Sequence, residues 1–164
     1  EILRCLVGSE MCIRDSIDAM MTEMDQFNLS DELSNSYRQL FKDVYAKAKY
    51  TVKDAEKMDD KDGYYVTVEI EQMTGLFNGI QEELMTEFTE WANSFDADTY
   101  PTEDEMYEQM YQMMYDLMSA RVDSITYNDP QEVVVEVIGE DNVYSISDGS
   151  MTELDEALLD VATE

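Results

Sequence analysis

The sequence predicts an α+β domain in which amphipathic helices pack on a four-stranded antiparallel sheet made of two hairpins. Apolar residues recur at steps of three and four in five segments, which is typical of helices with a buried face. They alternate with polar residues in two other regions, each divided by a turn, as hairpin strands do. The resulting order, ααββααββα, contains no repeat or flexible linker and predicts one α+β domain.

Two helices open the predicted domain. The first is marked by Ile17, Met20, Met21, Met24 and Phe27. The second begins near Ser30. Its apolar stripe consists of Leu33, Tyr37, Leu40, Phe41, Val44 and Ala48. Each stripe covers one face, so we expect both helices to pack on the sheet.

The first hairpin is predicted over residues 49–73. Residues 51–57 have an extended pattern, and residues 59–63, which are Asp, Asp, Lys, Asp and Gly, are typical of a turn. Apolar residues then alternate with their neighbours at Tyr64, Val66, Val68 and Ile70. This alternation predicts a half-buried strand.

A helical pair follows the first hairpin. One face of its first helix is apolar, and its members are Phe77, Ile80, Leu84, Phe88, Trp91 and Phe95. Residues 94–101 interrupt the pattern, and Thr102 with Glu105 predicts a capping box at the start of the second helix. Residues 106–125 are apolar over much more than one stripe, so we expect this helix to be largely enclosed.

The second hairpin is predicted from residue 133 onward. Val133, Val135 and Val137 predict a strand that ends at Gly139, residues 140–142 predict a turn, and residues 143–147 predict the returning strand. A second capping box is predicted at residues 150 and 153, Ser and Glu. A final amphipathic helix is expected to run to the C-terminus.

The charge is strongly negative and unevenly distributed. The 164 residues include 39 acidic residues, 10 basic residues and no histidine, and the formal net charge is −29. Residues 62–164 hold 26 of the acids and a single base, Arg121. Such a surface repels nucleic acid and anionic lipid headgroups, and it favours cations and basic partners. The chain also has no run near the roughly 20 apolar residues that a transmembrane helix needs.

Residues 4–16 contain both cysteines, Cys5 and Cys12, but no pattern of a signal peptide, lipid-attachment site or zinc site. The string LVGSEMCIRDS, residues 6–16, resembles the translated read-through of a sequencing adapter. We therefore expect residues 1–16 to be a non-native lead-in and residues 17–164 to form a single domain. The alternative is a short amphipathic lead-in in which both cysteines are buried thiols.

Three phrases of the chain carry a resemblance to known proteins. They are GYYVTVEIEQ (residues 63–72), MTEFTEWANSF (85–95) and VYSISDGS (143–150). With the element order, they make residues 17–164 resemble a loose group of uncharacterised extracytoplasmic lipoproteins of Gram-positive gut bacteria. The resemblance implies an extracellular domain anchored to the cell surface, with the anchor missing from this fragment. It implies no active-site residues.

Several chemistries are excluded by residue type. Without histidine, this polypeptide cannot build a Ser-His-Asp triad, a Cys-His pair or an H-E-x-x-H metal helix. It has no phosphate-binding G-x-x-x-x-G-K-[ST] loop, and Gly75 and Gly79 lack the spacing of a dinucleotide loop. We therefore assign no catalytic, cofactor-binding or metal-ligating residue and expect no cofactor.

Residues 58–69 come nearest to a metal site. Asp60, Asp62, Gly63 and Glu69 match positions three, five, six and twelve of a calcium-binding loop. Position one is Met58, however, and a strand follows where such a loop needs a helix. A hairpin turn explains the same residues better.

Two sets of large side chains have both a binding and a packing interpretation. Trp91 could stack on a sugar, but it shares a face with Leu84 and Phe88, so core packing is expected. A row of tyrosines and methionines could line a groove for a partner helix or an apolar ligand, although burial against the sheet is expected. The row consists of Tyr107, Tyr111 and Tyr115, interleaved with Met110, Met114 and Met118.

These observations predict a non-enzymatic, surface-exposed binding or interaction domain. Its partner is an unknown protein or a small apolar ligand, with basic partners or cations favoured by the charge. The alternative is a carboxylate-dependent hydrolase that acts on a cell-surface or glycan substrate, which needs two acids facing each other across a cleft. Residues 17–164 contain 36 acids, and the sequence nominates no pair among them.

Overall fold

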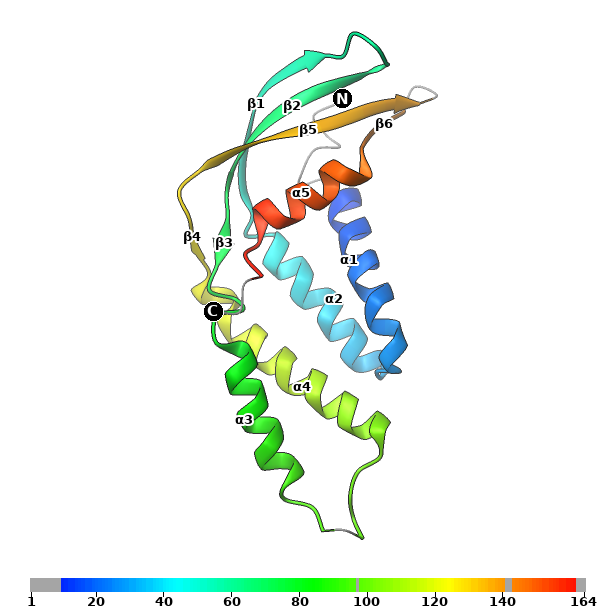
Figure 1. Cartoon of the computed structure of the whole chain (residues 1–164), viewed down its shortest axis with the longest axis vertical. Coiled ribbons are helices and arrows are strands. Elements are labelled where there is room, and N and C mark those ends of the chain that lie inside the picture. The colour runs from blue at the N-terminus through cyan, green and yellow to red at the C-terminus, as the bar shows by residue number, and fades with distance from the viewer. Residues whose placement is uncertain (1–9, 97, 141–142, 162–164) are drawn as a thin grey trace.

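A four-stranded antiparallel sheet forms one end of the molecule (Figure 1). The computed structural model describes residues 10–96, 98–140 and 143–161. The strands are β1 (Lys49–Lys57), β2 (Gly63–Glu71), β5 (Gln131–Glu140) and β6 (Val143–Ile146), in the order β1-β2-β5-β6. The predicted α+β class and the sheet of two hairpins are confirmed, and the hairpins join through β2 and β5.

The alternation in the strands gives the sheet one covered face and one open face. Val66 and Val68 of β2 and Val135 of β5 are fully buried. Val66 and Val135 are directly paired across the two strands, so the apolar set of each strand lies on the same face. On the opposite face, Tyr65 is 40% exposed and Val134 is 52% exposed. The helices therefore cover only one side of the sheet.

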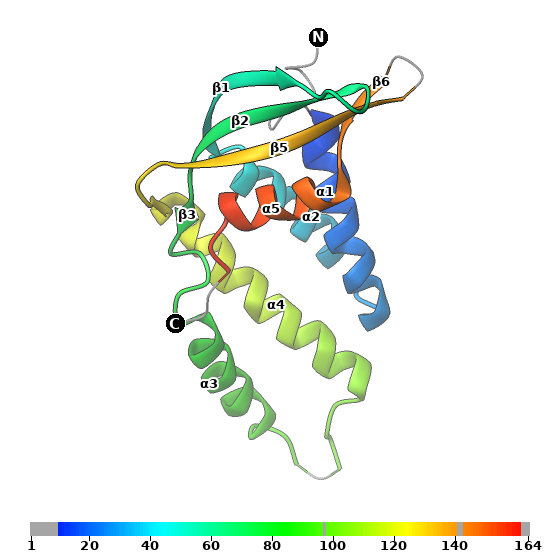
Figure 2. The same cartoon turned by 45° about the horizontal axis from the view of Figure 1, so that its top comes forward.

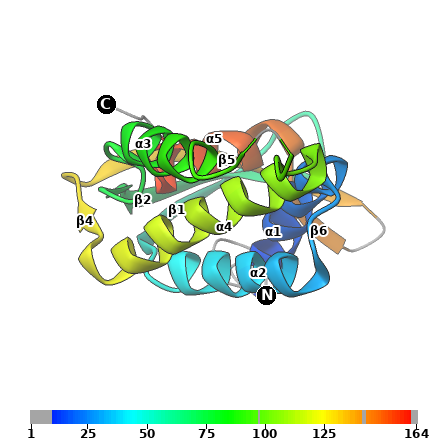
Figure 3. The same ribbon diagram turned by 90° about the horizontal axis from the view of Figure 1, so that it is seen from below.

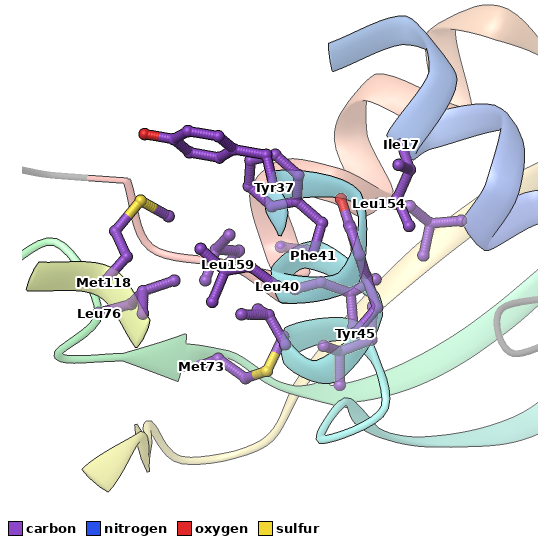
Figure 4. Close-up of a cluster of buried hydrophobic side chains, with 14 of the residues drawn as sticks. Ile17, Tyr37, Leu40, Phe41, Tyr45, Met73, Leu76, Met118, Leu154 and Leu159 are labelled. Carbon is purple, nitrogen blue, oxygen red and sulfur yellow. The ribbon is translucent and has the colours of Figure 1, made fainter. Parts of the chain in front are cut away.

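Three helices cover the inner face of the sheet: α1 (Glu10–Met24), α2 (Asp31–Tyr45) and α5 (Asp148–Leu158) (Figures 1 and 2). Ile17 of α1, Leu40 of α2 and Leu154 of α5 belong to one buried cluster with the sheet valines (Figure 4). A 3-10 turn, η2 (Asp25–Phe27), connects α1 to α2. The predicted start of the second helix is confirmed, because the Ser30 hydroxyl caps α2 by accepting the Leu33 N–H at 3.2 Å.

Helix α1 starts earlier than the sequence predicts. It begins at Glu10 and therefore includes residues 10–16 of the expected lead-in, among them Cys12. Cys5 lies outside the described residues, as do residues 141 and 142 of the predicted turn before β6. Ile17 of α1 is buried, with 1% of its surface exposed.

The predicted helical pair forms a hairpin that projects away from the sheet (Figure 1). It consists of α3 (Ile80–Ala92) and α4 (Glu103–Arg121), followed by the 3-10 turn η3 (Val122–Ser124). The hairpin is inserted between β2 and β5 through two short strands, β3 (Met73–Thr74) and β4 (Thr126–Tyr127). These two strands form the neck of the projection, and periodicity did not predict them.

The neck is held to the body by hydrogen bonds from several elements. The Asn128 N–H donates to the Gln72 carbonyl at 3.0 Å, next to the β3–β4 ladder. The Tyr127 hydroxyl donates to the Lys47 carbonyl at 2.9 Å, and the ammonium of Lys49 lies 3.6 Å from the centre of the Tyr127 ring. The residue after α5, Leu159, bridges to Met73 in parallel fashion. These contacts fix where the projection begins.

The expectation that residues 106–125 are largely enclosed is wrong. Met118 is the buried residue of α4, and the other methionines, the tyrosines and Leu117 of that helix are half-buried. The reason is that α4 packs between α3 on one side and α2 with η2 on the other, and it does not lie on the sheet (Figure 3). The wide apolar surface of α4 therefore packs against helices on two sides, and neither contact buries its side chains completely.

The capping box predicted at Thr102 is confirmed, whereas the one predicted at Ser150 is wrong. Hydrogen bonds from the Thr102 backbone and hydroxyl lower the pKa of Glu105. Helix α5 begins three residues earlier than predicted, with Ser147 as its N-cap. Ser150 is buried in the first turn, where its hydroxyl accepts the Glu136 N–H of β5 at 2.9 Å. Helix α5 also ends at Leu158, before the C-terminus.

Two buried tyrosines predict a loss of stability at alkaline pH. Burial raises the pKa of Tyr37 and Tyr45 well above the usual value near 10. The neutral phenols therefore stabilise the folded state fully below about pH 10, and that contribution falls as the pH rises above it. We expect urea denaturation to show a smaller pH dependence in Tyr45→Phe than in the unmodified chain between about pH 9 and pH 11.

A matched substitution separates Tyr45 from the other groups that titrate in this range. Tyr65 is 40% exposed on the open face of the sheet, so Tyr65→Phe is the matched control for removal of a tyrosine hydroxyl. Tyr45 is 8% exposed, and its hydroxyl donates to Asp155 at 3.3 Å. If both variants gave the same alkaline profile, burial of the Tyr45 phenol would not be a source of the effect.

Candidate binding surface

The distal part of the α3–α4 hairpin carries large apolar side chains that the core does not cover. Ile80 and Leu84, in the first half of α3, are buried. Phe88, Trp91 and Phe95, which continue the same stripe, are half-buried and lie outside the buried core and the side chains packed against it. The expectation that Trp91 packs in the core is therefore wrong, because the stripe runs past the end of the body.

Trp91 instead packs within a small aromatic group, which we call the tip cluster: Phe88, Trp91 and Phe95. The ring centre of Trp91 lies 5.4 Å from that of Phe88 and 4.9 Å from that of Phe95, with interplanar angles of 35° and 75°. Both neighbours of the indole are thus aromatic rings of its own hairpin. This arrangement disfavours a flat sugar platform and favours an apolar surface for another protein.

Two further large side chains of the hairpin are exposed, one on α3 and one in the loop that leads to α4. Met85 is 59% exposed and Tyr100 is 57% exposed. Met85 lies in a shallow open hollow on α3 whose other lining residues are Glu82, Thr86, Thr89 and Glu90. Apolar and acidic groups therefore alternate on the outer side of α3.

Helix α4 presents two different faces along its length. Its tyrosines face α2 and η2, since Tyr107 and Tyr111 contact Phe27 at ring distances of 5.3 and 5.0 Å, and Tyr115 contacts Tyr37 at 5.7 Å. The predicted burial of the three tyrosines against the sheet is wrong, because α2 and η2 cover them, whereas Met118 of the same row lies in the buried core with the sheet valines. Roughly opposite on the helix, by its 3.6-residue period, are three half-buried methionines. They are Met106, Met110 and Met113.

The methionine face and the tip cluster belong to the same two-helix layer. Helix α3 packs along α4 on the side away from α2 (Figure 3). The 3.6-residue period of α4 turns the three methionines toward that side, so we place them at the seam between the two helices. Two helices alone cannot enclose a seam of large side chains, which leaves these residues half-exposed. Methionine adapts its shape to different partners because its side chain is unbranched and flexible.

The electrostatic surroundings of the hairpin are entirely acidic. Residues 80–120 contain 11 acidic and no basic residues. The next residue, Arg121, lies at the base of the hairpin, where it pairs with Glu83 at 2.7 Å and is 18% exposed. By contrast, the sheet lysines Lys49, Lys53 and Lys61 are paired with glutamates of neighbouring strands. The apolar tip is therefore surrounded by acids that no base within residues 80–120 neutralises.

A second depression lies between α2 and α4, with a volume of about 470 Å³. Its lining mixes polar and apolar residues, including Gln39, Tyr115 and Val122. At its edge, Lys47 and Asp123 form an ion pair at 3.0 Å. The depression is open, and its polar side chains pair with one another, since Gln39 also donates to Asp43 at 2.8 Å.

The turn between β1 and β2 does not have the form of a calcium loop. Met58 is buried, with its N–H donating to the Gly63 carbonyl at 3.0 Å, and Gly63 begins strand β2. Asp62 receives the Gly139 N–H on its carbonyl at 2.8 Å, which ties the turn to β5. The hairpin interpretation of residues 58–69 is confirmed. Among the described residues, no group of three or more histidine, cysteine or acidic side chains could hold a metal ion.

The described carboxylates give no specific support to the hydrolase alternative. Within residues 10–96, 98–140 and 143–161, Ser150 is the one buried polar or charged residue. Partly buried acids have partners of structural character: Glu69 pairs with Lys53, and Glu108 accepts the backbone N–H and the hydroxyl of Ser30. No described helix is long and apolar enough to cross a membrane.

Together, the fold and the site define an α+β domain with an acidic, aromatic-tipped helical hairpin. The hairpin is inserted in the chain between β2 and β5, the two central strands that pair with each other in the sheet. The sequence matches no protein-family model. No curated protein matches it either. In structure, the chain is similar to a putative lipoprotein (YcdA) from Bacillus subtilis, with 12% sequence identity and a TM-score of 0.47. The match covers 90% of this chain and 44% of that protein, so the chain spans less than half of its length.

Sequence reasoning found the individual residues of this surface but not the surface itself. Trp91 and the tyrosine and methionine row were singled out separately, and each was expected in the core. The readable signal is the combination of large aromatic residues with a base-free acidic run over residues 80–120, because the absence of bases alone also holds for residues 122–164, which form β5 and α5 of the body.

Proposed function

We propose that this chain is a non-enzymatic interaction domain that binds another protein through the distal part of the α3–α4 hairpin. The observation that carries the proposal is the tip cluster, half-exposed at the end of α3 that lies farthest from the sheet (Figure 1). Contiguous exposed apolar surface with a polar rim is typical of protein interaction sites. Helical hairpins of this kind present side chains on rigid elements, which lowers the entropy cost of binding.

We place this interaction outside the cell, in a domain anchored at the cell surface. Support for the location comes from the sequence resemblance of residues 17–164 to extracytoplasmic lipoproteins, through phrases such as GYYVTVEIEQ. Protease treatment of intact cells tests it. A surface-anchored protein is degraded without cell lysis, whereas a protein retained inside the cell is protected.

Site-directed photo-crosslinking tests the binding proposal. A photoreactive amino acid is placed at Tyr100, in the loop between α3 and α4. It is expected to give a discrete crosslinked protein when the chain is mixed with surface proteins of the organism that produces it. The same group at Val134, which is 52% exposed on the open sheet face, serves as the control. Equal products at both positions, or none at Tyr100 while Val134 reacts, would mean that the tip is not the binding surface.

A further inference from the structure

We infer that the partner engages the tip through a basic amphipathic helix that lies on the α3–α4 seam. This inference rests on the proposed function and specifies the chemistry of the partner. It starts from an unpaired helix face: the tip cluster on α3 and the methionines of α4 line a seam that two helices cannot close. A third helix laid along the seam would bury them, as an amphipathic helix does in an apolar groove.

The length of α3 limits the size of the bound segment. Helix α3 has 13 residues, so it is about 20 Å long at a rise of 1.5 Å per residue. A partner helix of three to four turns therefore matches the seam. Its apolar residues would repeat at i, i+3, i+4 and i+7, the spacing that places them on one face.

The charge of the hairpin determines the other face of the partner. Glu82, Glu87 and Glu90 are exposed on α3, and no base lies within residues 80–120 to neutralise them. Met85 lies with Glu82 and Glu90 on the outer side of α3, so lysine or arginine side chains of the partner would reach over α3 from the seam, with their aliphatic stems on Met85 and their charges at these glutamates. An acidic or neutral helix would lose this attraction and meet repulsion in its place.

The same charge argument disfavours other occupants of the seam. A second copy of this chain would bring a formal charge of −29 against an acidic surface. Two of its strand lysines are already paired, Lys49 with Glu71 and Lys53 with Glu69. An anionic membrane surface is repelled for the same reason. Charge complementarity therefore favours a foreign, cationic helix.

Trp91 gives a direct measurement, because it is the single tryptophan of the chain and lies within the tip cluster. The probe is a synthetic peptide of about 14 residues, without tryptophan, that has leucines on one helical face and lysines elsewhere. At about 0.15 M salt, which screens long-range attraction, we expect a saturable blue shift of Trp91 emission. A scrambled peptide of the same composition is expected to bind at least about tenfold more weakly, since it cannot present one apolar face.

Paired variants of the protein locate the site. Replacing Glu82, Glu87 and Glu90 together by glutamine is expected to lower the affinity for the leucine–lysine peptide about tenfold, because each exposed charge contributes a fraction of a kcal/mol to binding. This triple leaves the Arg121–Glu83 pair intact. The matched control neutralises three exposed acids far from the tip and is expected to change affinity less than about threefold. The control residues are Glu132, Glu140 and Glu153.

The apolar contribution is tested at Met85, whose exposure makes its replacement harmless to folding. Met85→Gln is expected to lower the affinity for the peptide about threefold or more. Val134→Thr, at an exposed position of the sheet, is expected to leave that affinity unchanged. The inference fails if the scrambled peptide binds as well as the amphipathic one, if the local and remote triples behave alike, or if an acidic amphipathic peptide binds equally.

The outcomes separate this inference from the proposed function. If crosslinking at Tyr100 captures a protein without a basic amphipathic helix, the tip is still a binding surface and the chemistry assigned to its partner is wrong. If dilution of the chain alone shifts Trp91 emission, the seam is occupied by a second copy, and the foreign helix is excluded. If no protein crosslinks at Tyr100, the proposed function itself fails.

Discussion

Replacing Tyr37 by alanine is expected to lower the free energy of unfolding by about 3–5 kcal/mol, the usual cost of truncating a buried aromatic residue. Tyr37 is 1% exposed, and it joins α2 to α4 (Figure 4). Its ring centre lies 5.9 Å from that of Phe41, 6.2 Å from that of Tyr111 and 5.7 Å from that of Tyr115. Alanine would leave a cavity where the projection meets the body. Urea denaturation measures the loss.

Two companion variants separate ring packing from hydrogen bonding in this effect. The Tyr37 hydroxyl donates to the Tyr111 carbonyl at 2.7 Å. That carbonyl also accepts a bond within α4, so Tyr37→Phe is expected to cost only about 1 kcal/mol. Tyr65→Ala, at an exposed site of the sheet, controls for loss of a tyrosine as such. If Tyr37→Ala were no more harmful than Tyr65→Ala, the α2–α4 contact would not be part of the stable core.

The importance of Tyr37 shows which parts of this fold a sequence can reveal. Its place in a helical stripe with Leu33 and Phe41 predicted burial correctly, because helical periodicity is a local property. The strand alternation at Val66 and Val68 and the capping box at Thr102 were predictable for the same reason. Each depends on residues no more than a few positions apart.

The features that could not be predicted depend on contacts between distant segments. The neck pairs Met73 with Tyr127, and strands of two residues carry no readable alternation. Ser150 followed by Glu153 matches a capping box, but its hydroxyl bonds to β5 while Ser147 caps the helix. Whether an apolar helix is enclosed or stands at the surface depends on where its neighbours end, and that information is not local.

The candidate surface was hidden from sequence analysis by the same ambiguity. A stripe such as Leu84, Phe88 and Trp91 has one period from end to end, yet Leu84 is 8% exposed and the two aromatic residues are half-buried. Only the position of the neck determines how far the hairpin extends beyond the body. The local charge, however, can be read in advance, and an uncompensated run beside aromatic residues is a usable signal of a binding surface.

Raising the salt concentration from about 0.01 M to about 0.15 M is expected to stabilise the α3–α4 hairpin more than the sheet. The screening length falls from roughly 30 Å to roughly 8 Å over this range. Residues 80–120 hold 11 acids and no base, so their repulsion is relieved, whereas the sheet glutamates Glu69 and Glu136 already face lysines. Hydrogen exchange should show protection in α3 rising by about 1 kcal/mol more than protection in β2.

The location of this effect can be tested by changing the hairpin charge. The Glu82, Glu87 and Glu90 glutamine triple removes part of the repulsion, so it should reduce the salt response of α3 and leave that of β2 unchanged. Arg121→Gln should increase the response, because it deletes the cation that pairs with Glu83 at the base of the hairpin. An equal salt response in α3 and β2 would mean that the repulsion is spread over the whole molecule. The hairpin would then have no special electrostatic strain for a cationic partner to relieve, and charge would give that partner no reason to prefer the tip over any other acidic part of the surface.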